Sequence, residues 1–355
     1  MSEPGNLFET SVEILKKLIS IQSFSGEETS TADLLQEFFQ QSGMNPKRKA
    51  NNIWCVSNNC DSNAPILLLN SHHDTVKPGN GWQGNPFEPV LKDDKLYGLG
   101  SNDAGASVVS LVATFRHFAS QPKIPYRIII AITAEEEISG ANGISSILDD
   151  LGSIDLAIVG EPTEMQMAVA EKGLVVLDCT SEGKSGHAAR DEGVNAIYCA
   201  LEDIEFLRKH KFEKSSDLLG SVKMTVTQIK AGQQHNVVPA NCQFVVDVRT
   251  NEHYSNQQVV AFLQEHLKAT VIPRSLRLNS SGISLDHPIV VKGLSMGIKY
   301  FGSPTLSDQA LMDFPSIKIG PGKSSRSHTA DEFVLLSEIR EGIDTYINLL
   351  TDLNI

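Results

Sequence analysis

Leu67–Val76, with the sequence LLLNSHHDTV, joins a short apolar run to three consecutive ionisable side chains. The run is short enough to be a buried strand, and parallel α/β sheets bind ligands where the carboxyl ends of strands open into a crevice. His72 and Asp74 are two residues apart, so an extended backbone points them to the same side. An imidazole beside a carboxylate suits metal binding, because the carboxylate can orient the ring. Taken alone, such a segment is more often a capping or surface feature.

Two later apolar runs also end in acidic residues. Tyr126–Ala134 is followed by Glu135–Glu137, and Ile154–Val159 is followed by Gly160 and Glu161. Continuous rather than alternating hydrophobicity indicates strands covered on both faces, and hence a parallel or mixed sheet with helices on each side. A solvated acidic turn would explain the three glutamates by themselves. Strands that repeatedly deliver acidic residues to one edge of the predicted sheet are a more specific signal.

Lys95–Gly105 is predicted to be a strand that runs into a glycine-rich turn, and Asp103 lies in this turn at the start of the next predicted helix. An apolar helix is expected over residues 106–118, so Asp103 could be its N-cap as well as a ligand. Ser25 and Glu28 resemble a capping box ahead of another helix. From apolar spacing, the remaining helices are expected over residues 7–21, 28–42, 288–300 and 333–350, and a last strand over 316–319.

The order of the predicted helices and strands changes near Gly173. Strands at 174–179, 222–229 and 244–248 and helices near 194–209 and 256–268 are predicted there, in a βαββαβ-like order. A length of 355 residues also favours two domains. We therefore predict an α/β fold with a mixed, largely parallel sheet flanked by helices, formed by residues 1–172 and 285–355. Residues 173–284 are predicted to form a smaller inserted α+β domain.

Composition excludes several classes of protein. The formal net charge of −13 disfavours a nucleic-acid partner, since phosphate binding needs a basic surface. Five cysteines without a Cys-x-x-Cys pair argue against a disulfide framework and a thiolate zinc site, and they fit a reducing cytoplasm. No secretory signal is visible, and no apolar run has the length that spans a membrane. A cytoplasmic protein without a membrane partner is expected.

Four common catalytic motifs do not account for the chemistry of this chain. Neither Gly183–Ser185 nor Gly322–Ser324 is a phosphate-binding loop, because Asp178 and Ile317 stand where the first glycine is required. Gly293–Gly297 matches Gly-x-Ser-x-Gly, but it lies within the helix expected over residues 288–300 and not at the strand-to-helix turn that a nucleophile elbow requires. The sequence contains no His-Glu-x-x-His. Gly79–Gly84 matches Gly-x-Gly-x-x-Gly, but it lies in a loop rich in Pro, Gly and Asn and does not open a predicted helix, which disfavours a dinucleotide cofactor.

The residues that follow the predicted strands, with one late histidine, are all imidazoles and carboxylates. This donor type, without thiolates, suits zinc, cobalt or manganese. Two divalent ions need about five protein ligands, one of them bridging, and a further carboxylate can act as a base. The set comprises His72, Asp74, Asp103, Glu136, Glu137, Glu161 and His328.

At this point the chain resembles the M20 metallopeptidase and deacylase family, in its acetylornithine deacetylase and succinyl-diaminopimelate desuccinylase branch. The resemblance covers essentially the whole length and implies a zinc-peptidase-like catalytic domain. It rests on the ordered motifs Ser71–Val76, Tyr97–Asp103, Thr133–Glu137, Gly160–Thr163, Gly186–Ala189 and Ser327–Glu332.

Carried over by position, the resemblance implies a site with two zinc ions, for which cobalt or manganese could substitute. Asp103 would bridge the ions, and Asp74 would orient a ligand. Glu136 would be the general base. The remaining ligands would be His72 and Glu161 for one ion, and Glu137 and His328 for the other.

The resemblance also implies roles for the inserted domain, which forms a homodimer interface in this family. His187 would reach the active site of the neighbouring subunit and stabilise the oxyanion. Arg249 and Asn236 would contact the substrate, although Arg249 could instead pair with Asp247 or Glu252.

A few positions depart from the family pattern or are open to two interpretations. Asp308 could recognise a cationic side chain of the substrate. Leu99 stands where relatives usually carry arginine, which puts only the local packing in doubt. The basic loop Lys323–Ser327 could touch an acidic acyl group or be solvated.

The favoured reaction is hydrolysis of an amide. Glu136 would take a proton from a water activated by the ions and return it to the leaving amine. The predicted substrate is a small N-acyl amino acid, with acetylornithine and arginine biosynthesis as the leading hypothesis and acetylcitrulline or succinylated counterparts as variants. The alternatives are a carboxypeptidase or dipeptidase of the same family, or a succinyl-diaminopimelate desuccinylase. A non-catalytic metal-binding homologue is disfavoured because the base and all five ligands are present.

Overall fold

The computed structural model describes residues 4–190 and 192–355, which form two compact units. Unit 1 comprises the chain up to Val169, Ile283–Phe301 and Ser307–Ile355, and unit 2 comprises Ala170–Gly282 and Gly302–Leu306. From the sequence, the boundaries were expected at residues 172/173 and 284/285, without the short return of residues 302–306 to unit 2. No helix among the described residues is both long and apolar enough to cross a membrane.

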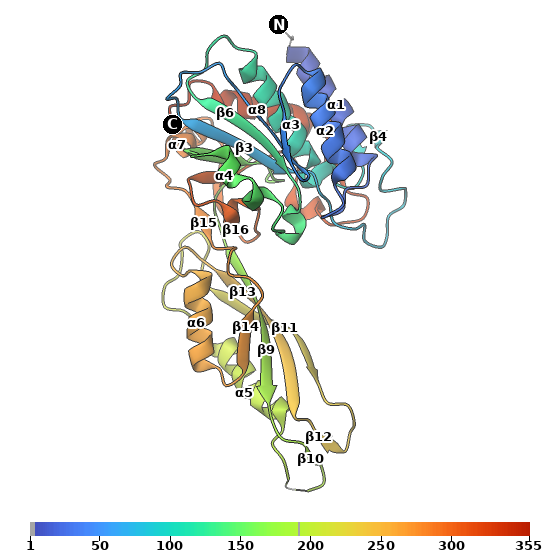
Figure 1. Cartoon of the computed structure of the whole chain (residues 1–355), viewed down its shortest axis with the longest axis vertical. Helices are drawn as coiled ribbons and strands as arrows, with labels where there is room; N and C mark the ends of the chain where they lie inside the picture. Colours follow the sequence, from blue (N-terminus) through green and yellow to red (C-terminus); the bar gives the residue numbers. More distant parts are fainter. Residues whose placement is uncertain (1–3, 191) are drawn as a thin grey trace. The chain divides into compact units, whose positions relative to one another are not determined.

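Unit 1 is built on a mixed sheet with a parallel centre (Figure 1). The strand order is β1-β2-β6-β3-β7-β17-β8-β15, and β16 also pairs with β8. The four central strands are parallel, and β1, β2, β8 and β15 pair antiparallel with their neighbours. The strands are β1 (Lys47–Lys49), β2 (Asn52–Val56), β3 (Ile66–His72), β6 (Arg127–Thr133), β7 (Leu156–Val159), β8 (Met167–Glu171), β15 (Ser281–Gly282), β16 (Tyr300–Ser303) and β17 (Ser316–Lys318).

Both faces of this sheet are buried, which explains the continuous apolar runs in the sequence. Leu67 and Leu69 of β3 belong to the core shared with helices α1, α3 and α8, and Leu68 faces a second core that includes Ile144 and Leu151. The helices of unit 1 are α1 (Pro4–Ile19), α2 (Thr29–Gln41), α3 (Ala106–Ala119), α4 (Leu148–Leu151), α7 (Pro288–Ser295) and α8 (Leu336–Leu350). The predicted fold class is confirmed.

A smaller sheet in unit 1 brings the end of the chain against the segment before Asp103. Its order is β18-β5-β4, with β4 at Val90–Lys92, β5 at Lys95–Tyr97 and β18 at Phe333–Leu335. Short turns of 3-10 or π type follow several strands: η1 (Ser101–Gly105), η2 (Glu136–Ile138), η3 (Ile144–Ser146), η4 (Asp308–Leu311) and η5 (Ser324–Arg326).

Unit 2 has the βαββαβ order expected from the sequence. Its four-stranded antiparallel sheet has the order β11-β13-β9-β14, and a two-stranded ribbon pairs β10 with β12. Helices α5 and α6 cover one face of the sheet, where alternate residues of β9 and β13 are buried (Figure 1). The elements are β9 (Gly173–Glu182), β10 (Gly186–His187), α5 (Ala196–Lys209), β11 (Lys223–Ala231), β12 (Val237–Val238), β13 (Asn241–Thr250), α6 (Asn256–His266) and β14 (Thr270–Pro273).

Three local expectations are wrong. Helix α7 ends at Ser295 instead of residue 300, and Tyr300 begins β16. Ser25 does not cap α2, whose N-cap Glu28 makes no side-chain capping bond. Asp103 is not an N-cap, because it lies inside η1 with φ −121° and ψ 99°, before the α3 N-cap.

Candidate metal centre

The candidate site lies at the carboxyl edge of the parallel strands in unit 1. His72 is the last residue of β3, and its pairing with Thr133 places the end of β6 beside it. Glu136 and Glu137 follow β6 in η2, and Glu161 lies two residues beyond the end of β7. Because these strands are parallel, their carboxyl ends converge at one edge, as expected for ligand sites in open α/β sheets.

One group of side chains surrounds Nε2 of His72. Asp103 Oδ1 lies 3.3 Å from this nitrogen, Glu161 Oε1 lies 3.7 Å away, and Glu136 Oε2 lies 3.8 Å away. Asp103 comes from η1, which precedes α3, so the group combines a strand end with a helix start. Three different segments of unit 1 therefore meet at one imidazole.

A second group surrounds His328. Its Nε2 lies 2.9 Å from Glu137 Oε2 and 3.7 Å from Asp103 Oδ2. The two carboxylate oxygens of Asp103 therefore face two different imidazoles, Oδ1 toward His72 and Oδ2 toward His328. This is the arrangement that a bridging carboxylate requires.

The donor atoms have the spacing and chemistry of a cation site. Ligand atoms at about 2.1 Å from a tetrahedral ion are roughly 3.4 Å apart, close to the separations around His72. Within the described chain, His72 with Asp103 and Glu137, and His72 with Glu136 and Glu161, offer ligand atoms within 4.8 Å of one another. Glu161 Oε1 is buried without a hydrogen-bond partner, which a bound cation would supply. The residues therefore fit divalent ions.

Electrostatics within the cluster favour protonation when no cation is bound. Burial raises the pKa of Glu161 to about 8, with the Asp103 and Glu137 charges adding to the effect and His72 opposing it. Burial also raises the pKa of Glu136, again against the effect of His72. Although burial opposes its charged form, His72 has a raised pKa because Glu136, Asp103, Asp74 and Glu161 surround it. Cations would replace these protons, since metal ligands bind in their deprotonated forms.

Asp74 connects His72 to the η2 turn, which carries Glu136 and Glu137. Its Oδ1 lies 3.3 Å from His72 Nδ1 and accepts from the backbone N–H of Glu136 at 3.1 Å. Its Oδ2 accepts from the N–H of Glu137 at 3.2 Å and from Ser25 Oγ at 2.7 Å. Burial opposes the charged form of Asp74, but the hydrogen bond and charge of His72, the bond from Ser25 and the charge of His73 outweigh burial and lower the pKa of Asp74 to about 2. Ser25 thus serves the site instead of capping α2.

Sequence reasoning gave no role to Glu332 and Asn102, which hold the turn that carries Asp103. The buried Glu332 accepts from the N–H groups of Gly100, Asn102 and Asp103. Asn102 Oδ1 accepts from the N–H of Lys323, and its Nδ2 donates to Ser327 Oγ. The turn is therefore fixed to the loop that precedes His328. Position in the motifs Tyr97–Asp103 and Ser327–Glu332 was the only signal for these two residues.

Three of the predicted residues belong to unit 2. His187 is exposed in β10, and its Nδ1 accepts from the N–H of Ala189. The backbone carbonyl of Asn236 accepts from Ala188 on the same ribbon. Arg249 makes a bidentate ion pair with Asp247, with N–O distances of 2.8 and 3.0 Å, as one of the two interpretations anticipated.

Asp308 lies in unit 1 but is buried. Its Oδ2 accepts from Thr133 Oγ1 at 2.7 Å, and Asn70 Nδ2 donates to the same hydroxyl at 3.0 Å. Burial raises the pKa of Asp308 to about 6, although the bond from Thr133 opposes the shift. A carboxylate enclosed in this way is better suited to supporting the end of β6 than to reading a substrate side chain.

The two departures from the family pattern have local explanations. Leu99 is 5% exposed and lines a cavity of about 20 Å³ with Leu18 and Ile19, so an apolar side chain is accommodated there. In the basic loop, Lys323 pairs with Glu164 and Arg326 pairs with Glu338. Both cations are thus engaged within unit 1.

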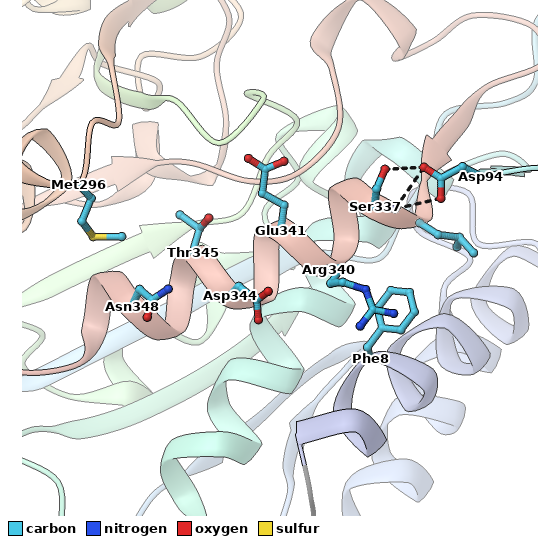
Figure 2. Close-up of a pocket in the computed structure, with 10 residues that line it drawn as sticks. Phe8, Asp94, Met296, Ser337, Arg340, Glu341, Asp344, Thr345 and Asn348 are labelled. Carbon is cyan, nitrogen blue, oxygen red and sulfur yellow. Dashed lines mark hydrogen bonds between the residues drawn. The ribbon is translucent and has the colours of Figure 1, made fainter.

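A groove of about 540 Å³ runs along the exposed side of α8 in unit 1 (Figure 2). Arg340 lies over the ring of Phe8 with 3.8 Å to the centroid, and Ser337 bonds to Asp94. None of the predicted site residues lines this groove. The cluster around His72, and not the groove, is therefore the candidate catalytic site.

Fold and site together define a metal-dependent hydrolase. The sequence model of peptidase family M20/M25/M40 matches residues 68–352, and the chain belongs to this family. It is 27% identical over 278 residues to succinyl-diaminopimelate desuccinylase 2 of Ruegeria sp. strain TM1040, covering 73% of this chain and 69% of the relative.

Solved structures share the fold. A tripeptidase from Staphylococcus aureus superposes with a TM-score of 0.78 at 21% identity and 97% coverage of both chains. A dinuclear metal-binding peptidase from Bacillus subtilis gives a TM-score of 0.73 at 13% identity, with 98% of each chain covered. The protein is accordingly a hydrolase that acts on amide bonds.

Proposed function

We propose that the protein removes the acyl group from a small N-acyl amino acid, with two zinc ions at the His72–His328 cluster. The observation that carries the proposal is the orientation of Asp103, whose two oxygens face the two imidazoles. His72 and Glu161 would hold one ion, and Glu137 and His328 the other. Cobalt or manganese could substitute, because the donors are imidazoles and carboxylates.

Divalent ions bound here would lower the pKa of a water and polarise the acyl carbonyl. Glu136 faces the cluster from η2, so its carboxylate can accept the proton of the attacking water. Burial raises the pKa of this carboxyl, which suits a group that later donates the same proton to the leaving amine. Asp74 keeps Nε2 of His72 turned toward the cluster through its contact with Nδ1.

The named relatives and the sequence motifs favour different acyl groups. Relatives named succinyl-diaminopimelate desuccinylase support a dicarboxylic acyl group, whereas acetylornithine deacetylation in arginine biosynthesis was the first prediction from the sequence. The tripeptidase fold relative keeps peptide cleavage as the second candidate. Arg249 in unit 2 is the proposed partner of the substrate α-carboxylate, and Asn236 would contact the substrate from the same unit.

We also propose that the protein is a homodimer formed through unit 2. Strand β11 is an edge strand of the four-stranded sheet. On the neighbouring helix α5, Tyr198 and Leu201 are 68% and 50% exposed. An edge strand beside exposed apolar residues is a surface that a second copy could cover. His187 would then act in the site of the partner.

The test is a hydrolysis panel on zinc-loaded protein, with acetyl and succinyl forms of ornithine, citrulline and diaminopimelate, and a few dipeptides. We expect kcat/KM to be higher for one N-acyl series than for any dipeptide. Dipeptides that exceed every N-acyl compound would replace the deacylase proposal with the peptidase alternative.

A second measurement tests the metal site itself. Elemental analysis of loaded protein should approach two ions per chain, and Asp103→Ala should lose most of them because both groups lose a donor. A wild-type stoichiometry that saturates at one ion with full activity would remove the second ion from the proposal.

A further inference from the structure

The turn that carries Glu136 is held by side chains from other segments of unit 1. Four consecutive backbone N–H groups, those of residues 134–137, each donate to a side-chain oxygen. The acceptors come from the start of β2, the residue before α2 and the segment after β3. They are Asn52 for Ala134 at 3.0 Å, Glu28 for Glu135 at 3.2 Å, and Asp74 for Glu136 at 3.1 Å and Glu137 at 3.2 Å.

Glu28 is the acceptor without a role so far. Its side chain is fully buried, and its Oε1 accepts from the N–H of Gly26 at 2.6 Å as well as from that of Glu135. Its Oε2 accepts from Asn51 Nδ2 at 2.9 Å. A carboxylate only accepts hydrogen bonds, so it matches these three donors. Glu28 therefore connects the start of α2 to a backbone group 107 residues away.

The backbone of Glu135 needs such support. Its φ of 57° and ψ of 19° lie in the left-handed region, which is unfavourable for residues with a Cβ. A non-glycine residue keeps this conformation only when its surroundings hold it. Glu136 follows directly, so the conformation of Glu135 sets the direction in which the Glu136 side chain leaves the chain. If the N–H of Glu135 were released, Glu136 would be free to turn away from His72.

We propose that Glu28 is a positioning residue, which holds the N–H of Glu135 and thereby keeps Glu136 directed at the His72–His328 cluster. This inference rests on the proposed function, in which Glu136 transfers the proton. None of the hydrogen bonds described for Glu28 goes to a proposed metal ligand. Its loss should therefore affect proton transfer more than metal binding.

Two substitutions of Glu28 separate its hydrogen bonds from its charge. Glu28→Met keeps an unbranched side chain and removes both acceptor oxygens. Glu28→Gln removes the charge but keeps one oxygen for the N–H of Glu135, and the amide of Asn51 can turn over to accept from the new NH₂ group. If Glu28→Met does not fold, Glu28→Asp takes its place, because its shorter side chain draws the oxygens back from Glu135.

The matched control is Ser57→Ala, at the other end of the same strand. The buried Ser57 Oγ accepts from the N–H of Ile128 at 2.8 Å, near the start of β6. Its loss also leaves a buried backbone N–H of this strand without its side-chain acceptor, but far along the strand from Glu135. A general loss of stability would therefore affect both variants, whereas a loss of positioning would affect only Glu28→Met.

We expect Glu28→Met to lower kcat of the zinc-loaded protein by about tenfold to a hundredfold, because a misplacement of about 1 Å can cost about a hundredfold. KM should stay within about twofold, and the metal content should stay near that of wild type because all five proposed ligands remain. Glu28→Gln and Ser57→Ala should keep kcat close to that of wild type. A native kcat in Glu28→Met, or an equal loss in Glu28→Gln or Ser57→Ala, would overturn the proposal.

A double substitution shows whether Glu28 acts through Glu136. Residues that act as a unit have non-additive effects on rate. Glu28→Met combined with Glu136→Gln should therefore be about as slow as Glu136→Gln alone. If the two losses multiply instead, Glu28 acts independently of the base, and the positioning role is wrong.

Hydrogen exchange separates this inference from the proposed function. Exchange is followed by mass spectrometry in metal-free wild type, Glu28→Met and Ser57→Ala. Residues 134–139 should exchange faster in Glu28→Met than in the other two proteins, because the N–H of Glu135 has lost its acceptor. If wild type hydrolyses no substrate, the proposed function fails. Exchange then still decides whether Glu28 holds the turn, since an unchanged rate over residues 134–139 overturns the inference.

Discussion

Glu136 has the position and the acidity that a proton-transfer group needs. Its carboxylate faces His72, and burial raises its pKa, with the charges of Glu161, Asp308 and Glu137 adding to the effect of burial while His72 opposes it. Glu136→Gln keeps the shape but can neither accept nor return the proton. We expect kcat to fall by about three orders of magnitude or more, while the metal content measured by elemental analysis stays near that of wild type.

The adjacent Glu135 provides the control for this variant. Its carboxylate accepts from the N–H and the Nδ2 of Asn142, so its contacts lie with that residue. Glu135→Gln should retain kcat within a few-fold. Near-native turnover in Glu136→Gln, or an equal loss in both variants, would refute the assignment of the base.

Protons and cations should compete for the same residues. Burial raises the pKa of Glu161 to about 8, and the bond to Glu137, which outweighs burial, raises the pKa of His328 to about 9. A raised pKa in the folded state gives stability that is complete below the unfolded pKa and is lost as pH rises through the folded value. Deprotonation of Glu161 and deprotonation of His328 therefore both lower the stability of the metal-free protein as pH rises.

We predict that metal-free protein loses thermal stability as pH rises from about 6 to 9. Zinc-loaded protein should lose less, because the ions take the place of the protons. The measurement is Tm against pH for protein treated with chelator and for protein reloaded with zinc. A flat or rising Tm of the metal-free protein over this range would contradict the argument.

At the scale of elements, the η1 turn depends on one buried carboxylate. Glu332 accepts three backbone N–H groups from η1 and the residue before it. In Glu332→Gln one acceptor becomes an NH₂ group that faces a donor. We expect a loss of roughly 1–3 kcal/mol of unfolding free energy, measured by urea denaturation of metal-free protein, and weaker metal binding because Asp103 lies in this turn.

Asp331→Asn is the matched control for the η1 prediction. Asp331 precedes Glu332 in the chain, and its Oδ1 accepts only from the N–H of Gln83 among the bonds described for it. Its substitution should leave metal affinity unchanged. Equal effects of the two substitutions would assign the loss to the loop in general and not to the bonds of Glu332.

The sequence predicted those features that follow from local pattern. Apolar runs such as Leu67–Leu69 mark strands because both faces of the central sheet are buried, and parallel pairing then places the residues after each strand at one edge. The βαββαβ order of unit 2 could also be predicted from local pattern, because strands and helices differ in the period of their hydrophobic residues.

Hydrogen bonds between residues far apart in the sequence could not be predicted from local pattern. Ser25 was expected to cap α2, but it donates to Asp74, a partner 49 residues away. Glu332 supports Asp103 across 229 residues. A capping box and a buried network use the same residue types, and only the tertiary fold decides between them.

At the scale of the whole molecule, the proposed dimer can be tested by mixing inactive chains. Glu136→Gln removes the base from its own subunit, and His187→Ala removes the histidine that the partner would receive. After random exchange, half of the dimers contain one chain of each kind. In each of these, the site with an intact Glu136 receives His187 from the Glu136→Gln chain. The expected recovery is therefore about a quarter of native sites.

Each variant measured alone sets the baseline, and differently tagged chains show by co-purification that exchange has occurred. His187 is exposed in β10, where its ring accepts a single local bond from Ala189, so His187→Ala should fold normally. If mixed dimers form without recovering activity, His187 acts in its own subunit or outside catalysis. If no dimers form at all, the homodimer proposal fails, and the oxyanion must be stabilised by groups of the same chain.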